Sequence, residues 1–510
     1  MLSASRFTTS LPGDPLDDNV PRPVEGALWS KVLPSPVSSP SLLAFSREVA
    51  DQLGLDEAGV RALLPTLAGN ETNGLVPWAA NYGGHQFGHW AGQLGDGRAI
   101  GLGELRGQEL QLKGAGPTPY SRRGDGRAVL RSSIREFLCS EAMAHLGVPT
   151  TRALSLVVTG DRVMRDMFYD GHPELEPGAI VCRVAPSFLR FGNFELCASR
   201  EDVSLLRALT EHTMATHFPE LPRGDFAALL REVAERTARL LAHWQAVGFV
   251  HGVMNTDNMS MLGLTIDYGP YGWVDDFDPS WTPNTTDAQQ RRYRYGNQPG
   301  IGLWNVERLG IALLPLLTNE KAGGPAGEPA DVIDDAMQAY QRTYEKEAST
   351  RFCSKLALVP SPGNIELVNS LFTWLAAEET DFTLFFRSLS TLVAERPTAI
   401  PDGVFYASVP ESHVREGIAW LGRWWDALPK NETQSLAVKL NATNPKYVLR
   451  NYLAQEAIDA AQSGRPEAVM ELLDVMRRPF DEQPGREKYA ARRPDWARTK
   501  AGCSALSCSS

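Results

Sequence analysis

Short apolar runs separated by glycine-rich turns are the main pattern between residues 81 and 190. Alternating or short apolar runs bounded by turn residues are typical of strands. Arg106 and Gly107 have the composition of a turn between two such runs. Strands are therefore predicted over 99–105, 108–113, 153–160 and 162–166 (the last two as a hairpin), 179–185, and 263–269.

Apolar residues at helical spacing dominate the rest of the chain. They predict helices over 128–147 and 226–248, which end at Gly147 and Gly248. Before residue 81 the sequence indicates a proline-rich arm followed by helical pieces, one of them over 41–55. Residues 300–480 are predicted to be mostly helical, with one linker-like patch at 324–332.

Length and charge limit the possible partners. With 510 residues the chain exceeds the usual size of a single hydrophobic core, so at least two packed units are expected. Its 61 acidic and 50 basic residues give a net charge of −11, which argues against non-specific binding to nucleic acids or anionic membranes. The most apolar run, 309–317, is far shorter than the roughly 20 residues of a membrane span. No nucleic-acid or membrane partner is expected, and a monomer is the default expectation.

The six cysteines are sparse and lack metal-ligand spacing, which favours a reducing compartment. The N-terminus has no apolar signal core, so a cytoplasmic location is expected. Cys503 and Cys508 lie in a polar tail, "KAGCSALSCSS", where we expect exposed thiols that are open to oxidation.

The stretch "HGVMNTDN" (251–258) has the outline of a protein-kinase catalytic loop, and "TIDYGP" (265–270) follows it. Asn258 and Asp267 match the two metal ligands of a kinase in order and spacing, and their oxygens suit Mg²⁺. Val253 stands where a kinase has its catalytic Asp, and Asp257 supplies a carboxylate next to Asn258. Taken singly, Asn258 could be an ordinary loop residue and Asp267 part of a turn, but their joint spacing favours a metal site. His251 is expected to anchor the loop.

Upstream, the strand 108–113 ends in Lys113, and the helix 128–147 contains Glu136. The glycine-rich stretch 95–104 could cover phosphates, Lys113 could reach them, and Glu136 could hold Lys113 in place. The alternatives are an ordinary glycine turn, a solvated edge lysine, and a capping box between Ser133 and Glu136. The capping box is disfavoured because the apolar spacing of the helix begins upstream, at Leu130.

Several arginines in this acidic chain point to an anion. Guanidinium groups suit phosphate oxygens, although two or three members of the series are expected to be structural, in ion pairs with nearby carboxylates. Arg183 interrupts an apolar run, where an unpaired charge would be costly, and Arg190 follows it closely. The series in the second glycine-rich loop and its helix is Arg122, Arg123, Arg127, Arg131 and Arg135.

The order of strands, helix, strands and a helical half is that of a bilobal protein kinase. We therefore expect an α+β, protein-kinase-like fold with a β-rich N-lobe, an α-rich C-lobe and extensions at both ends. The expected divisions are an N-terminal extension at 1–80, an N-lobe at 81–185, a helical C-lobe at 186–430, and a C-terminal helical extension with the cysteine-containing tail at 431–510.

Long motifs resemble the SelO family from about residue 15 to the end. They include "HQFGHWAGQLGDGRA", "LKGAGPTPYSRRGDGRAVLRSSIREFL", "RVAPSFLRFGNFE", "HGVMNTDNMSMLGLTIDYGP" and the terminal "CSS". The resemblance implies a pseudokinase fold that binds ATP in a flipped orientation. It also implies transfer of AMP to Ser, Thr or Tyr hydroxyls of proteins with release of pyrophosphate, with UMP transfer from UTP also attributed to bacterial members, and a requirement for Mg²⁺ or Mn²⁺.

The resemblance also implies roles for individual residues. Asp257 would be the catalytic base, Asn258 and Asp267 the metal ligands, and Glu136 the partner of Lys113. Nucleotide contacts are implied for Gly95, Gly97, Arg98, Lys113, Asp125, Gly126, Arg183, Arg190 and Asp267. A flipped ATP would place its α-phosphate over the catalytic loop, which leaves the β- and γ-phosphates to Lys113 and the arginine-rich loop.

Some relatives carry a cysteine in the loop that corresponds to "SWTPNTTDAQQ", able to bond to the C-terminal cysteine, but this chain has Pro283 near that place. Regulation through such a bridge is therefore in doubt, and Cys508 is instead expected to be redox-active or to pair with Cys503. Two other functions remain open. A catalytically inactive ATP-binding scaffold is disfavoured by the retained metal ligands, and an ordinary phosphotransferase by Val253.

Overall fold

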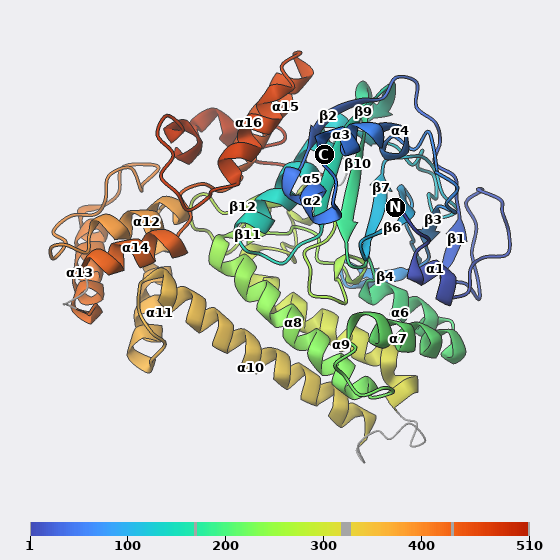
Figure 1. Ribbon diagram of the computed structural model, residues 1–510. Helices are drawn as coiled ribbons and strands as arrows, with labels where there is room; N and C mark the ends of the chain where they lie inside the picture. The colour runs from blue at the N-terminus through green and yellow to red at the C-terminus, as the bar shows by residue number, and fades with distance from the viewer. Residues whose placement is uncertain (1, 168–170, 318–327, 430–432, 508–510) are drawn as a thin grey trace.

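An eight-stranded antiparallel sheet and a large helical region make up most of the structure (Figure 1). The computed structural model describes residues 2–167, 171–317, 328–429 and 433–507. The sheet has the strand order β1-β3-β6-β7-β10-β9-β2, and β8 pairs with β10 beside this path. The expected mixture of a β-rich part and an α-rich part is confirmed.

The strands fall into the main sheet and two small pairs, β4 with β5 and β11 with β12. Their bounds are β1 Trp29–Lys31, β2 Ser41–Phe45, β3 Trp78–Ala80, β4 Gly83–Gln86, β5 His89–Gln93, β6 Ala99–Leu105, β7 Gln108–Lys113, β8 Ala128–Val129, β9 Arg152–Arg165, β10 Glu174–Ala185, β11 Phe249–Val250 and β12 Gly272–Trp273.

The α-helices of the described residues differ in length: the four before residue 70 are short, and the three longest lie between residues 226 and 355. Their bounds are α1 Arg6–Ser10, α2 Arg47–Leu53, α3 Glu57–Ala62, α4 Leu64–Leu67, α5 Leu130–His145, α6 Phe191–Ser199, α7 Val203–His217, α8 Phe226–Val247, α9 Gln298–Leu317, α10 Pro329–Lys355, α11 Pro362–Ala377, α12 Phe382–Ser388, α13 Glu411–Ala427, α14 Thr433–Thr443, α15 Asn451–Gln462 and α16 Glu467–Met476.

The middle of the sheet places charged residues at one end of neighbouring strands. In β7, Lys113 lies opposite Ala99 of β6 and Val181 of β10, and Arg183 lies opposite Gln111. Helix α5 packs against β9 and β10 with a largely buried surface. The sheet therefore fixes the spacing of Lys113 and Arg183, and α5 presents its side chains to both.

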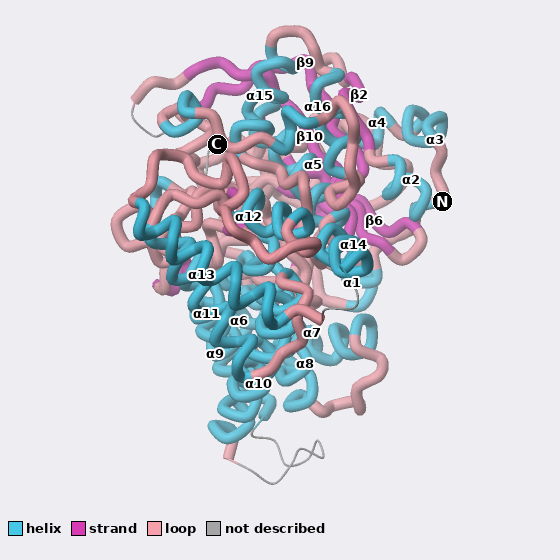
Figure 2. The backbone as a smooth tube through the Cα atoms, turned by 90° about the vertical axis from the view of Figure 1, so that its left-hand side faces the viewer, coloured by secondary structure: helices cyan, strands magenta, loops and turns pink. Residues whose placement is uncertain are grey.

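The helices α6 to α10 form a bundle at the opposite end of the molecule from the sheet (Figure 2). In this bundle α9 packs against α6, α8 and α10. Within the described residues, one segment, Tyr295–Leu317, is long and apolar enough to cross a membrane by length and composition alone. Half of its apolar window is buried, as in a core helix.

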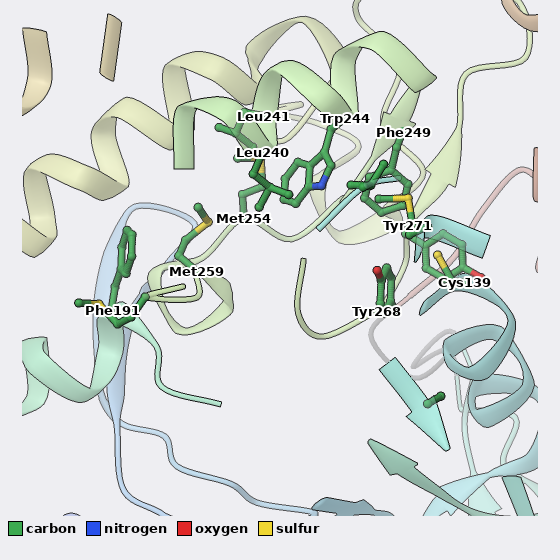
Figure 3. Packing of buried hydrophobic residues seen from close by; sticks show 14 of the residues in the cluster. Cys139, Phe191, Leu240, Leu241, Trp244, Phe249, Met254, Met259, Tyr268 and Tyr271 are labelled. Atoms are coloured by element: carbon green, nitrogen blue, oxygen red, sulfur yellow. The ribbon is translucent and has the colours of Figure 1, made fainter. Parts of the chain in front are cut away.

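An aromatic cluster joins α8 to the segment that carries the catalytic-loop motif (Figure 3). Trp244 of α8 stacks on His251 with ring centroids 5.3 Å apart, and Phe249 lies edge-on to Trp273 at 5.1 Å. Tyr268 and Tyr271 pack edge-to-face at 5.7 Å and are buried. Trp244 and Phe249 precede residues 251–270, and Trp273 follows them. Because these rings pack against one another and against His251, Tyr268 and Tyr271, they hold the loop in one position.

The C-terminal helices α15 and α16 return to pack against α5, and the tail then runs on towards the loop after residue 280. Leu506 forms a bridge with Asn284, and Asn284 Nδ2 donates to Gly252 O at 2.9 Å. Asn451 Nδ2 donates to Cys503 O at 2.9 Å, and Thr285 N donates to Leu506 O at 2.8 Å. The tail therefore links α15 to the loop beside the catalytic-loop motif.

Deletion of residues 502–510 is expected to lower the melting temperature. It removes the acceptor of Asn451, which is 5% exposed, and a buried donor without a partner costs about 1–3 kcal/mol. Differential scanning calorimetry of the full and shortened chains measures the difference. Asn451→Ala, which removes one bond and keeps the tail, should give a smaller fall, and equal melting temperatures for all three proteins would contradict the prediction.

Several predicted elements differ from the structure. Residues 41–45, assigned to a helix, form the strand β2, which pairs with β9, and the helix α2 begins only at Arg47. The expected hairpin over 153–166 is one strand, β9, which pairs with β10 on both sides of a register shift. The predicted strand over 263–269 is reduced to a single parallel bridge between Thr265 and Thr150, with Thr151 N donating to Thr265 O at 3.0 Å.

Two further expectations concern the boundaries. The segment before residue 81 has the expected short helices, and it also supplies β1, β2 and β3 to the main sheet. In the linker-like patch, residues 324–327 lie outside the described residues, and from Pro329 onward the chain is helix α10. The predictions for β6, β7, α5 and α8 agree with the structure within two residues at each end.

Candidate active site

Asp267 lies at the centre of a buried charge cluster between the sheet and the catalytic-loop motif. Its carboxylate accepts hydrogen bonds from Arg183 of β10 and from Arg190, the residue before α6. Lys113 Nζ lies 3.9 Å from Asp267 Oδ1. The backbone of Asp267 is left-handed, with φ +62°, a conformation that non-glycine residues adopt rarely and that is enriched at functional sites.

Lys113 and Glu136 form an ion pair, with Nζ 2.7 Å from Oε2. The other carboxylate oxygen of Glu136 lies 3.4 Å from Arg183 Nη1. Helix α5 is preceded by Val129 and has no side-chain cap, so Glu136 lies well past its first turn. The capping-box alternative is therefore excluded, and Glu136 instead holds two cations at the end of the sheet.

Arg190 connects this cluster to the catalytic-loop motif. Its Nη1 donates to the carbonyl oxygen of Asp257 at 2.7 Å, and its Nη2 lies 3.8 Å from Asp96 Oδ1. Its guanidinium lies over the ring of Tyr82, 4.7 Å from the centroid. Arg190 is only 1% exposed, so it fixes the position of the loop relative to Asp267.

The charged groups in the cluster shift one another's pKa values. Burial raises the pKa of Asp267, but the charges of Arg190 and Arg183 outweigh it and hold this pKa well below its usual value. Burial lowers the pKa of Lys113, against the opposing effect of Glu136. Burial also raises the pKa of Asp96, an acidic residue that accepts from Gln111 Nε2 at 3.0 Å. Asp267 is thus an anion whose charge is balanced by cations.

Asp257 behaves differently from Asp267. Burial raises its pKa to about 7, although Arg190 lowers it. Its Oδ2 accepts from Gln86 Nε2 at 3.4 Å, and its Oδ1 is buried with no hydrogen-bond partner among the described residues. A carboxylate with a pKa near neutrality and an unused acceptor atom can take a proton from a bound hydroxyl.

Glycine at position 84 makes room for the Asp257 side chain. A Cβ at Gly84 would lie 2.6 Å from Asp257 Oδ1, closer than any real contact. The hairpin of β4 and β5 thus covers Asp257 directly, and His85 N donates to Thr256 Oγ1 of the same loop at 2.7 Å.

Asn258 and His251 complete the loop. Asn258 Nδ2 donates to Val253 O at 3.0 Å, which leaves its Oδ1 as the atom suited to a ligand. His251 Nε2 contacts Ile266 O at 2.8 Å and the residue is buried, so its predicted anchoring role is confirmed. Val253 is 8% exposed and gives no acid–base group at its position.

The two glycine-rich loops pack on each other beside this cluster. Gly97 O accepts from Ser121 Oγ, and Gly95 lies against the ring of Tyr120 with φ +68°. A side chain at Gly95 would overlap that ring. Arg98, half-buried, follows these glycines at the start of β6, and its positive charge contributes to the lowered pKa of Lys113.

The second glycine-rich loop, which contains Asp125 and Gly126, is held mainly by contacts that do not involve the Asp267 cluster. The Asp125 carboxylate forms an ion pair with Arg165 at 2.7 Å, and it is 48% exposed. Gly126 has φ +68° and packs against the backbone of Gly116. The ion pair with Arg165 therefore places Asp125 apart from the Asp267 cluster.

Part of the arginine series is structural, as expected. Arg131 forms an ion pair with Glu176 at 2.7 Å, and Arg135 donates to Tyr271 O at 2.9 Å. Arg127 donates to Ser35 O at 3.2 Å. Arg122 and Arg123 are exposed.

Two residues of this region carry donor atoms of the kind that a divalent cation prefers. Asn258 and Asp267 offer amide and carboxylate oxygens, which are hard ligands suited to Mg²⁺ or Mn²⁺, and phosphate oxygens would complete the coordination. A separate group, Glu48, Glu141 and His145, has ligand atoms within 4.8 Å of one another. Both sites hold a carboxylate that is paired with arginine: Glu141 accepts from Arg152 through both oxygens, and Asp267 accepts from Arg183 and Arg190.

The tail cysteines differ from expectation in one respect. Cys503 was predicted to be exposed, but it is 5% exposed, and burial raises its pKa to about 11, so it is a poor thiolate. The tail residues around it form hydrogen bonds to α15, which a polar sequence does not reveal. Cys508 and any pairing with it lie outside the described residues. Pro283 O accepts from Leu506 N at 3.1 Å, so this loop and the tail are neighbours without a cysteine in the loop.

Sequence reasoning did not select several residues of this region. Asp96 lies between the two selected glycines of "LGDGR", and it accepts from Tyr82 Oη at 3.2 Å. Gln86 and Gly84 lie in the glycine-rich stretch 81–105, which was noted only for its composition. Gln86 lies 171 positions before Asp257 in the sequence, and Gly84 is similarly distant. Local sequence spacing therefore could not reveal either contact.

Comparison with known proteins gives one family and close relatives. The family model described as "Protein adenylyltransferase SelO" matches residues 24–477. The chain is 55% identical over 526 residues to "Protein nucleotidyltransferase YdiU" of Aromatoleum aromaticum, with 99% of each chain covered. It is 53% identical to the protein of the same name from Xanthomonas axonopodis pv. citri and 54% identical to that from Azoarcus sp. strain BH72, again with 99% of each chain covered.

Proposed function

Because the chain belongs to the SelO family and is a protein nucleotidyltransferase, we propose that it transfers AMP from ATP to Ser, Thr or Tyr hydroxyls of target proteins. The observation that carries the proposal is the pairing of Asp257, a buried carboxylate with a pKa near 7, with the adjoining cluster of Asp267, Lys113, Arg183 and Arg190. This arrangement offers a base in the catalytic-loop motif and a polyphosphate site at the adjoining end of the central strands β7 and β10.

In the proposed reaction the acceptor hydroxyl oxygen attacks the α-phosphorus of ATP. The bond between this phosphorus and the bridging oxygen to the β-phosphate breaks, and pyrophosphate leaves with the bonding electrons. Asp257 takes the hydroxyl proton, for which its unpartnered Oδ1 is suited. Lys113, Arg183 and Arg190 would bind the β- and γ-phosphates and stabilise the charge that forms on pyrophosphate.

A divalent cation, Mg²⁺ or Mn²⁺, would be held by Asn258 and Asp267 and would withdraw charge from the phosphate oxygens. Asp267 is now bonded to Arg183 and Arg190. When ATP binds, its phosphates would accept from these arginines, which frees the Asp267 carboxylate. Nucleotide binding would in this way prepare the residues that bind the cation.

We further propose that the fold is a bilobal protein-kinase-like (pseudokinase) fold, with the divisions predicted from the sequence. The ion pair of Lys113 and Glu136 between a central strand and α5, and the loop of Asn258 ahead of Asp267, support it. In that fold the nucleotide would bind between sheet and helices. A cytoplasmic monomer acting on ATP, with UTP as a second donor, completes the proposal.

Transfer of the label from ATP distinguishes the proposal from its alternatives. Incubation with a protein mixture and Mg²⁺ should label protein from [α-³²P]ATP and leave it unlabelled from [γ-³²P]ATP. Label from the γ-position alone would establish a phosphotransferase. Absence of both labels, with ATP binding intact by calorimetry, would favour the inactive scaffold.

A further inference from the structure

The hairpin of β4 and β5 carries an exposed aromatic and basic surface next to Asp257. Trp90 is 38% exposed, and its ring lies 5.1 Å from that of His85. His85 also meets the ring of Trp304 of α9 edge-on at 5.5 Å. We call the surface formed by Trp90, His85, Trp304 and Arg292 the hairpin platform.

Arginines give the platform its charge. The Arg292 guanidinium lies over the ring of Trp304, 4.7 Å from its centroid. Arg291 and Arg294 stand on either side in sequence, and Arg291 is exposed. Within the described residues none of these three arginines forms an ion pair with a carboxylate, whereas the chain as a whole carries a net charge of −11. Asp287 partly offsets the charge of Arg292: burial raises the pKa of this carboxyl group, and Arg292 acts to lower it. Three arginines against one carboxylate between residues 285 and 294 still leave this segment of an acidic protein positively charged, which favours an anionic partner.

The platform is joined rigidly to the catalytic-loop motif. Phe87 N donates to Asn255 Oδ1 at 3.2 Å and to Tyr293 Oη at 3.0 Å, and Tyr293 Oη donates to Asn255 Oδ1 at 2.6 Å. Gln86, between His85 and Phe87, contacts Asp257. A segment lying on the platform would therefore lie beside the loop that carries Asp257.

The platform also has a buried support. His85 Nδ1 lies 2.6 Å from Glu195 Oε1, and Glu195 is 4% exposed. This contact fixes the His85 ring, against which both Trp90 and Trp304 pack. Aromatic and arginine side chains that are held in place before binding are typical of residues that dominate binding energy in protein interfaces.

We propose that the hairpin platform binds the acceptor protein, and that it selects segments in which acidic residues flank the hydroxyl group. This inference rests on the proposed function, because it presupposes a protein acceptor. The arginines would pair with the acidic residues, and Trp90 would pack on the peptide chain. The acceptor hydroxyl would then lie at Asp257. The acidic residues of the acceptor segment would stay on the platform, outside the phosphate site.

Peptide binding tests the platform without requiring transfer. Three fluorescent serine peptides of equal length, flanked by glutamates, glutamines or lysines, are titrated with the protein, a non-hydrolysable ATP analogue and Mg²⁺, and anisotropy is measured. The glutamate peptide should bind about tenfold more tightly than the lysine peptide, and Arg292→Glu should reverse this preference. Trp90→Ala should weaken all three peptides about fivefold or more.

Control measurements distinguish an effect on the platform from damage to the nucleotide site and from failure of the proposed function. Arg423→Glu, an equal charge change at an exposed position of α13, should leave peptide binding unchanged. The affinity for the ATP analogue, measured by calorimetry, should be the same in Arg292→Glu and Trp90→Ala as in the parent protein. Equal binding of the three peptides, or a loss of nucleotide affinity in Trp90→Ala, would overturn the proposal. Peptide preference without α-label transfer would instead uphold the platform and reject the proposed reaction.

Discussion

Asp267→Asn is expected to abolish nucleotide transfer, with a loss on the order of a thousandfold or more in kcat. A bound cation supplies several kcal/mol of stabilisation to the developing charge, and each 1.4 kcal/mol corresponds to about a factor of ten in rate. Asparagine keeps the size of the side chain and removes the charge that would hold the cation. The measurement is the initial rate of label transfer from [α-³²P]ATP at saturating Mg²⁺.

Nucleotide binding in the same variant separates catalysis from folding. Without the Asp267 charge, Lys113, Arg183 and Arg190 lose a counter-ion, so the melting temperature should fall. Metal-free ATP should bind the variant at least as tightly as the parent protein, because the Asp267 carboxylate no longer competes with the phosphates for the three cations. ATP in EDTA should therefore raise the melting temperature of the variant by more. Full transfer activity in Asp267→Asn would refute the role of this residue.

The strands and helices that the sequence predicts correctly are those whose pattern is decided locally. Glycine ends fix α5 and α8, and the turn at Arg106 and Gly107 fixes β6 and β7. The segment "SLLAF" was taken for a helix because a short apolar run fits either structure. Pairing with β9, more than 100 residues away, decides that it is a strand, and this information is absent from the local pattern.

The candidate site shows the same division. Asp257, Asn258 and Asp267 stand close together in the sequence, so their spacing alone drew attention to them. Lys113 and Glu136 were linked by the order of strand and helix. Asp96 and Gln86 were missed because their contacts depend on how the hairpin and the first glycine-rich loop fold over the catalytic-loop motif. Such contacts arise from the tertiary fold, and no periodicity along one chain encodes them.

Gly84 offers a way to disturb Asp257 without removing it. Its backbone does not require glycine, but a Cβ there would meet the Asp257 carboxylate at 2.6 Å. Gly84→Ala should therefore displace the carboxylate and lower kcat while leaving ATP affinity unchanged. Gly363→Ala, where a Cβ meets nothing within 4 Å, is the matched control and should behave as the parent protein.

Asp257→Asn is expected to lower kcat by roughly 10²–10⁴-fold, the usual contribution of a general base. The asparagine side chain fits the same space between Gly84 and Gly192 but cannot accept the hydroxyl proton. Because Asp257 makes no ion pair with the phosphate-binding cations, the affinities for ATP and for the acceptor should be almost unchanged. Rates measured at saturating ATP, together with calorimetric ATP binding, separate the two effects. An unchanged kcat would assign the proton to another group, and a large loss of ATP affinity would place Asp257 in the nucleotide site instead of at the acceptor hydroxyl.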